Sequence, residues 1–96
     1  MQLRGNDIEV TWNLKTYDGL DISPGSGTMY VYNRNFRIKI DSEINVSRVT
    51  AIIPGVLECG EYSIEYIYNG GRCNVMNAIV ITNDISQADS KSITIN

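Results

Sequence analysis

Apolar and polar residues alternate along most of this chain, which is the pattern of β-strands that bury one face and expose the other. The clearest run covers residues 7–16, where Ile8, Val10, Trp12 and Leu14 alternate with polar residues. We expect Trp12 to anchor the core from this strand. No stretch combines a helical period with matching caps. Further β-rich runs occupy residues 28–32, 36–40, 44–53, 61–68 and 73–82.

In three of these runs the pattern bears on which face is predicted to be buried and on whether the run forms one strand or two. In residues 28–32, Met29 and Val31 lie on one face of the strand and Tyr30 and Tyr32 on the other, so either face is a candidate for burial. In residues 36–40 the three apolar side chains, beginning with Phe36, are predicted to point inward. Residues 44–53 are either one strand bent near Ser47 or two short strands.

The runs at 61–68 and 73–82 are predicted to form a β-hairpin. The sequence Asn69-Gly70-Gly71 lies between them, and these residue types tolerate the positive φ of a tight hairpin turn. The first run is rich in tyrosine and isoleucine, which fit a pleated and half-buried surface. Neither face of the second run is cleanly polar, so we expect that strand to be central or covered on both sides.

The segment that leads into this hairpin has a more specific pattern. Leu57, Gly60 and Tyr62 have the spacing Leu-x-x-Gly-x-Tyr, which resembles the tyrosine corner of immunoglobulin-like sandwiches. In that motif the tyrosine ring fills the end of the core, and its hydroxyl donates to the backbone a few residues upstream. Gly60 would permit the sharp turn. The alternative is an ordinary turn followed by a strand tyrosine.

Short strands separated by turns at intervals of about 8–12 residues indicate an all-β fold. We predict an immunoglobulin-like antiparallel β-sandwich of about seven strands over residues 1–85. Residues 86–96 are mostly small and polar and are predicted to be a tail or linker. Within that segment, an additional short strand at residues 92–96 is the alternative.

Composition supports one folded domain and argues against some classes of partner. The chain has 96 residues, of which 43% are hydrophobic and 20% are charged. The net charge of −3 argues against binding to nucleic acid or to an anionic membrane. No run approaches the roughly 20 apolar residues of a membrane span, and no apolar signal segment is expected at the N-terminus.

The two cysteines are predicted to be free thiols. If the hairpin turns at residues 69–71, Cys73 lies opposite Ile67 and Cys59 lies opposite Ile81. The two sulfur atoms would then be several residues apart along the sheet, too far for a disulfide. Free thiols suit folding in a reducing compartment.

Catalytic and metal chemistry is not expected. The chain has no histidine, so a serine triad or a cysteine–histidine pair is excluded. Glu61 and Glu65 would be roughly 13 Å apart along a strand, too far for a glycosidase pair. Asp18 and Asp21 fit a turn better than a calcium site, which needs six or more oxygen ligands. We therefore predict a non-enzyme without metal, cofactor or small-molecule substrate.

Several short motifs together resemble a viral family. They are residues 3–7 before the first strand, residues 57–65 around the corner, Gly71-Arg72, Asn77-Ala78-Ile79 and Ile81. This set, spread over residues 3–88, resembles the N-terminal module of tail-fibre or baseplate-type structural proteins of phages and prophages in Bacteroides. That module is similar to the N-terminal domain of upper-baseplate proteins in siphophages.

The resemblance implies an immunoglobulin-like structural or adaptor module of the virion tail, made in the bacterial cytoplasm. Its partners would be other phage structural proteins, with a homo-oligomer possible, bound through sheet edges or end loops. The chain stops at Asn96 without a long fibrous or distal region, which argues against receptor recognition and leaves an adaptor role, a fragment or a stand-alone prophage remnant.

The alternative function is a cell-surface adhesion or glycan-binding β-sandwich. Six tyrosines and one tryptophan raise the possibility of sugar stacking on exposed rings. This alternative requires an accessible ring platform. If Trp12, Tyr62 and Tyr66 are buried, most of that platform disappears.

Overall fold

The computed structural model describes residues 1–16, 18–88 and 91–96. Across this part of the chain it contains eight strands and one short 3-10 turn, η1, at Ile85–Gln87. The strands are β1 (Gln2–Leu3), β2 (Ile8–Asn13), β3 (Gly25–Tyr32), β4 (Arg37–Asn45), β5 (Arg48–Ile53), β6 (Gly60–Tyr68), β7 (Gly71–Thr82) and β8 (Ser92–Ile95).

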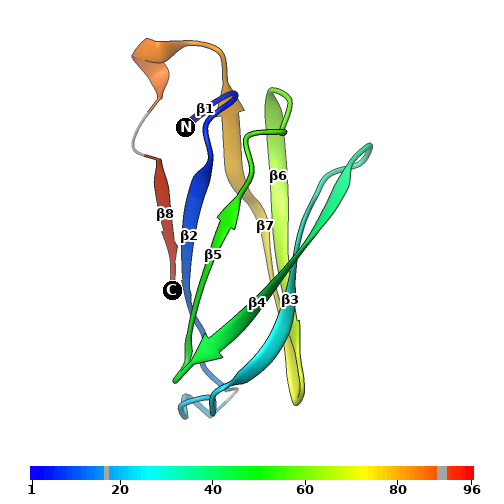
Figure 1. Ribbon diagram of the computed structural model, residues 1–96, viewed down its shortest axis with the longest axis vertical. Helices are drawn as coiled ribbons and strands as arrows, with labels where there is room; N and C mark the ends of the chain where they lie inside the picture. The colour runs from blue at the N-terminus through cyan, green and yellow to red at the C-terminus, as the bar shows by residue number, and fades with distance from the viewer. Residues whose placement is uncertain (17, 89–90) are drawn as a thin grey trace.

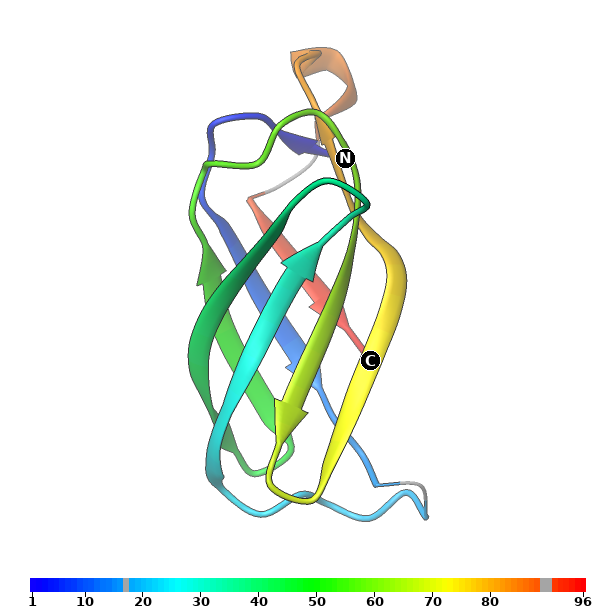
Figure 2. The same ribbon diagram turned by 90° about the vertical axis from the view of Figure 1, so that its right-hand side faces the viewer.

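The strands form one mixed sheet in the order β1-β7-β6-β3-β4-β5-β2-β8, which curls into a half-barrel (Figures 1 and 2). Neighbouring strands are antiparallel except for the pairs β1–β7 and β2–β8, which are parallel. The predicted all-β class is confirmed. The sheet has eight strands and not about seven, and it is not wholly antiparallel.

Strand β4 explains why one sheet continues around the molecule. It pairs with β3 along residues 37–44, but with β5 only through Ile44 and Asn45. It therefore crosses diagonally from one wall of the half-barrel to the other, as Figure 1 shows. The two walls are therefore joined by hydrogen bonds within one sheet.

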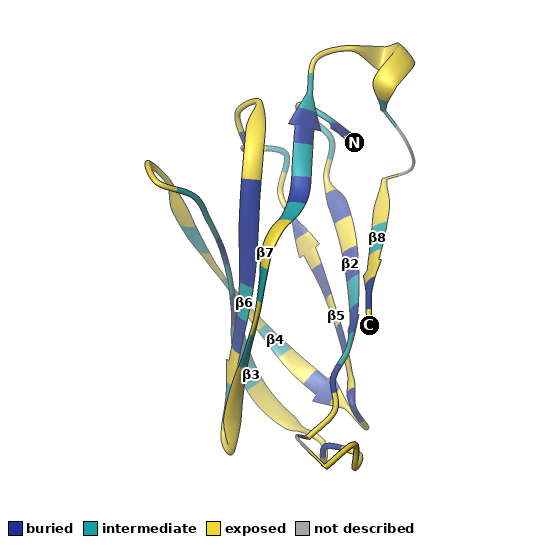
Figure 3. Cartoon of the chain, turned by 180° about the vertical axis from the view of Figure 1, so that it is seen from behind, coloured by how far each residue is buried: buried dark blue, intermediate teal, exposed yellow. Residues whose placement is uncertain are grey.

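The core fills the concave face of the sheet and takes apolar side chains from β2 to β8. Figure 3 shows where the buried residues lie along these strands. On β2 the alternation works as expected, since Ile8, Val10 and Trp12 are buried and Glu9 is exposed. The prediction for Trp12 is confirmed. On β3 the buried residues are Met29 and Val31, which decides the face that the sequence left open.

The prediction for Phe36 is wrong. Its side chain is 36% exposed, because the residue lies just before β4, at the tip of the β3–β4 hairpin beyond the covered part of the sheet. The ring packs edge-on against Tyr62, with centroids 6.3 Å apart. Ile38 and Ile40 pack against the core only partly.

The run at residues 44–53 is divided between two strands. Val46 and Ser47 lie between β4 and β5 with φ angles of 41° and 67°. Positive φ at both central residues is the conformation of a two-residue hairpin turn whose twist matches that of the sheet. Of the two predicted possibilities, the structure shows two strands.

The C-terminal segment takes part in the sheet. Strand β8 lies parallel to β2, with Val10 opposite Ile93 and Trp12 opposite Ile95. Ile95 is buried in the core. The predicted tail or linker at residues 86–96 is therefore wrong for β8, and the short-strand alternative is confirmed; residues 89–90 lie outside the described residues.

Candidate functional site

Tyr62 makes the contact that defines a tyrosine corner. Its side chain is only 2% exposed, and its hydroxyl donates to the carbonyl oxygen of Glu58 at 2.6 Å. Leu57 is buried beside this corner, and Gly60 adopts φ 144°, a conformation that residues with a side chain rarely adopt. Burial, assisted by the negative charge of Glu58, raises the pKa of Tyr62. The hydrogen bond is the one that the sequence predicted.

The two glycines of the hairpin turn have different roles. Gly70 has φ 118°, which a residue with a Cβ atom would adopt only with strain. Gly71 does not have a positive φ, but a Cβ atom there would lie 2.9 Å from the hydroxyl of Tyr68. The turn thus needs one glycine for conformation and the other for space.

The pairing of β6 with β7 is interrupted by a bulge. Ser63 on β6 faces residues 76–78 on β7, and the register changes between Tyr62 and Ile64. Asn77 adopts φ 52°, and its N–H donates to the hydroxyl oxygen of Ser63 at 3.1 Å. Extra residues in one strand of a pair bend that strand and strengthen its twist.

The two-residue turn and the bulge change the expected positions of the cysteines, the turn at Cys73 and the bulge near Cys59. Cys73 lies opposite Tyr66 and not Ile67, while Ile81 faces Gly60, the residue after Cys59. Both thiols are free, as predicted, and Cys59 is exposed. Burial raises the pKa of the half-buried Cys73 thiol.

Beyond the turn, β7 has an open side. Its pairing with β1 involves only Ile81 and Thr82, so residues 71–75 have β6 on one side and no described strand on the other. The expectation of a central or doubly covered strand is wrong for this half of β7, where no residue is fully buried. Figure 3 shows the contrast with the blue and teal end of the same strand.

The convex face next to this open side carries a small group of mixed side chains. The amide of Asn74 donates to the hydroxyl of Tyr32 at 2.7 Å, and that hydroxyl lies 3.9 Å from the sulfur of Met76. Met76 is 68% exposed. Nearby, Arg72 lies 3.7 Å from Glu65. The sequence pattern missed this surface, although polar residues at Arg72, Asn74 and Asn77 were the available signal.

The three rings required for a sugar platform are inaccessible. Trp12, Tyr62 and Tyr66 are 3%, 2% and 0% exposed, respectively. The Tyr66 hydroxyl lies 3.3 Å from the carbonyl oxygen of Ser42, to which it donates. These rings pack in the core and present no stacking surface to a ligand.

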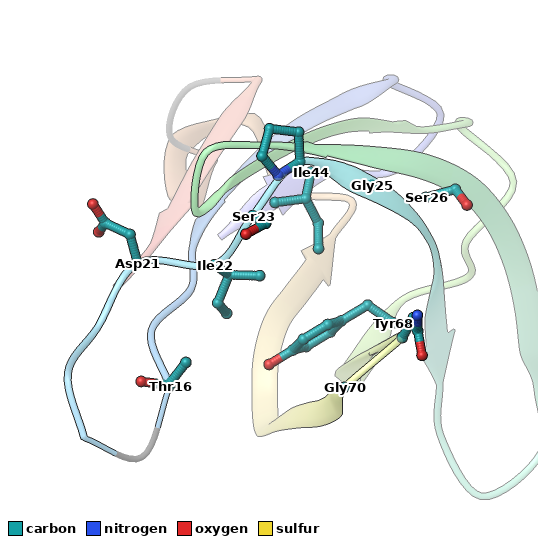
Figure 4. Close-up of a pocket in the computed structure, with 11 residues that line it drawn as sticks. Thr16, Asp21, Ile22, Ser23, Gly25, Ser26, Ile44, Tyr68 and Gly70 are labelled. Atoms are coloured by element: carbon teal, nitrogen blue, oxygen red, sulfur yellow. The ribbon is translucent and has the colours of Figure 1, made fainter.

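A shallow hollow of about 580 Å³ lies between the loop before β3 and the turn after β6 (Figure 4). Ile22, Ile44 and the ring of Tyr68 contribute apolar surface, and Thr16 and Ser23 contribute hydroxyls. The carboxylate of Asp21 is bonded to Lys15 and accepts from Ser47, and these contacts lower its pKa.

The described acidic residues are spread over the surface. Within that part of the chain, no three residues of the types that bind metals are grouped closely enough to hold an ion. Glu61 and Glu65 face different partners on β7, Val80 and Asn74. Glu58 forms an exposed ion pair of 2.7 Å with Arg4.

No protein-family model matches this chain, and comparison with curated proteins and with solved structures gives no match. Among the described residues, no helix has the length and apolar character needed to span a membrane. The open side of β7 at residues 71–75, called the β7 edge below, is the candidate binding site. Among the described residues, β4 at residues 37–43 and the terminal strand β8 also have a strand on one side only.

Proposed function

We propose that this chain is a non-enzymatic adaptor that binds other proteins by adding a strand at the β7 edge. In this proposal it is an immunoglobulin-like structural module of a phage or prophage tail or baseplate. The observation that carries the proposal is the run of five β7 residues with no strand on its outer side. An unpaired edge offers backbone donors and acceptors to an extended segment of another chain.

The geometry of the hairpin turn determines which backbone N–H and C=O groups of residues 71–75 point away from β6. Tyr68 and Gly71 flank the two-residue turn and face each other, so they form the hydrogen-bonded pair that closes the hairpin. Hydrogen-bonded pairs alternate along antiparallel strands, which directs the N–H and C=O groups of Cys73 and Val75 toward β6. Those of Arg72 and Asn74 consequently point outward, toward an added strand.

The finer parts of the proposal have separate support. The tyrosine corner at Tyr62 and the parallel pairing of β1 with β7 favour an immunoglobulin-like arrangement. The assignment to a virion rests on the resemblance of residues 3–7 and 57–65 to phage tail and baseplate modules. A glycan-binding surface protein is the weaker candidate, because Trp12, Tyr62 and Tyr66 are buried. The ring of Tyr68 borders the hollow described above.

The test compares two substitutions at Asn74, whose backbone N–H and C=O groups point away from β6. Asn74→Pro removes an outward N–H without removing a bond to β6, whereas Asn74→Thr retains that N–H. Both variants lose the side-chain bond to Tyr32, which makes them matched. Binding is measured by pull-down against purified tail and baseplate proteins encoded beside the gene. We expect Asn74→Thr to bind and Asn74→Pro to lose at least tenfold in affinity.

Equal binding by the two variants would overturn the edge as the docking site. A gene neighbourhood of surface-polysaccharide enzymes, with no binding to tail proteins, would overturn the virion role. Binding of oligosaccharides that Tyr68→Ala abolishes would favour the glycan-binding candidate instead.

A further inference from the structure

We propose that the occupant of the β7 edge is the same edge of a second copy of this chain, paired antiparallel about a two-fold axis at Cys73. This inference rests on the proposed function because it uses the same β7 edge, for which a second copy and a tail protein would compete. In the pairing, residues 71–75 of the two copies lie side by side. Two half-barrels would then share one continuous sheet.

The backbone of the edge fits this pairing. Only Arg72 and Asn74 direct their N–H and C=O groups outward within the five residues, for the reason given above. With the axis at Cys73, Arg72 lies opposite the second copy's Asn74, and Asn74 lies opposite the second copy's Arg72. Both are hydrogen-bonded pairs, so all four outward groups of each strand gain partners.

The side chains are self-complementary in the same register. Arg72 is the one charged residue among residues 71–75, and it falls opposite a neutral asparagine, so no like charges face each other. Glu65 faces Asn74 across β6 and β7, and the second copy's Arg72 extends that same row. A carboxylate and a guanidinium from different copies therefore lie on either side of Asn74.

The edge lacks two common protections against such pairing, although Arg72 supplies one charged side chain. Residues 71–75 contain no proline and no lysine, the residues that commonly block exposed edges. Protection begins at residues 76–78, where the bulge with Asn77 at φ 52° interrupts the straight run. The contact is limited to five residues on each side, so it forms a small interface that predicts a reversible, concentration-dependent dimer. A two-fold contact closes on itself and does not propagate into fibres.

Cys73 gives a direct readout of the register. On the axis it forms a non-hydrogen-bonded pair with its own copy, in which Cα atoms are about 4.5 Å apart. That separation satisfies disulfide geometry. The native cysteines provide matched variants, because Cys59→Ser leaves only Cys73 and Cys73→Ser leaves only Cys59.

The experiment treats both variants with diamide and analyses the products by non-reducing electrophoresis. We expect Cys59→Ser to form a covalent dimer and Cys73→Ser to remain mostly monomeric, with at least a fivefold difference in yield. In parallel, sedimentation of the untreated chain should show a dimer that Asn74→Thr retains and Asn74→Pro loses. Circular dichroism establishes that each variant is folded.

A chain that is monomeric at every concentration and gives no Cys73 product would overturn the second copy as occupant. A dimer that survives Asn74→Pro, or one that cross-links through Cys59, would also overturn it. If the chain is monomeric while Asn74→Pro still abolishes binding to a tail protein, the proposed function stands and only this inference fails. If neither assay responds to Asn74→Pro, both fail.

Discussion

At the scale of single residues, the hydroxyl of Tyr62 joins the end of the core to the chain that enters β6. Tyr62→Phe keeps the ring and removes the bond to the Glu58 carbonyl. We expect the free energy of unfolding to fall by about 0.5–1.5 kcal/mol, measured by urea denaturation. Tyr30→Phe on the convex face is the control and should change stability by less than about 0.5 kcal/mol. Equal effects would contradict the corner.

Gly27 is a residue whose lack of a side chain matters for packing. A Cβ atom there would collide with the hydroxyl and ring of Tyr66 and lie 2.8 Å from the carbonyl oxygen of Ile67. We expect Gly27→Ala to destabilise the fold by about 1–3 kcal/mol. Gly25→Ala, with open space around its added atom, should be close to neutral or slightly stabilising in the same denaturation assay.

Single residues were predictable where local pattern and chemistry agree. Trp12 lies on a strand with strict alternation, and the hydroxyl of Tyr62 needs a partner when the ring is buried. Phe36 follows the same alternation, but it lies at a hairpin tip where the opposite side of the core ends. Alternation along a strand predicts which face a residue lies on. It does not predict how far along the half-barrel the residue lies, because the tertiary fold sets that position.

At the scale of elements, Ser63 holds the bulge that ends the straight part of β7. Ser63→Ala removes the acceptor of the Asn77 N–H. We expect a loss of about 1 kcal/mol in the free energy of unfolding and faster amide exchange at Asn77. Ser26→Ala, at an exposed position on β3, should stay within about 0.5 kcal/mol of the parent. Unchanged exchange at Asn77 would contradict the role of Ser63.

The strands themselves could be predicted from the sequence more readily than the way in which they pair. The hairpin of β6 and β7 follows from its composition and from Asn69-Gly70. The bulge depends on a side-chain hydrogen bond across the pair, which no local pattern reveals. Strand β8 alternates Ile93 and Ile95 with polar residues, but it gains stability only from pairing with β2, more than 80 residues earlier in the chain.

At the scale of the whole molecule, buried tyrosines predict sensitivity to alkali. Burial raises the pKa values of Tyr62, Tyr66 and Tyr68. The unfolded chain ionises these phenols near their usual pKa of about 10, whereas the folded chain keeps them protonated to higher pH. Their contribution to stability is therefore complete below pH 10 and is lost as the pH rises through the folded values.

Denaturation midpoints between pH 8 and 11.5 measure this loss, and absorbance at 295 nm follows phenol ionisation. Tyr62→Phe should reduce the slope of stability against pH above 10. The same slope in the parent and the variant would contradict burial as the cause.

The all-β class was predictable because alternation and turn residues extend along the whole chain. The continuous half-barrel was not, because it depends on β4 pairing with two different strands and on both terminal strands joining in parallel. Such long-range pairings are chosen by the packing of the complete core. The β7 edge was hidden for the same reason, since a strand's sequence does not state whether a neighbour covers it.

The most direct test of an open β7 edge is residue-resolved amide hydrogen exchange by NMR, at a concentration where the chain is monomeric. Cys73 and Val75 should exchange slowly, since their N–H groups point toward β6, and Arg72 and Asn74 should exchange at least tenfold faster. Slow exchange at all four positions in the monomer would show that the edge is covered and would contradict strand addition there.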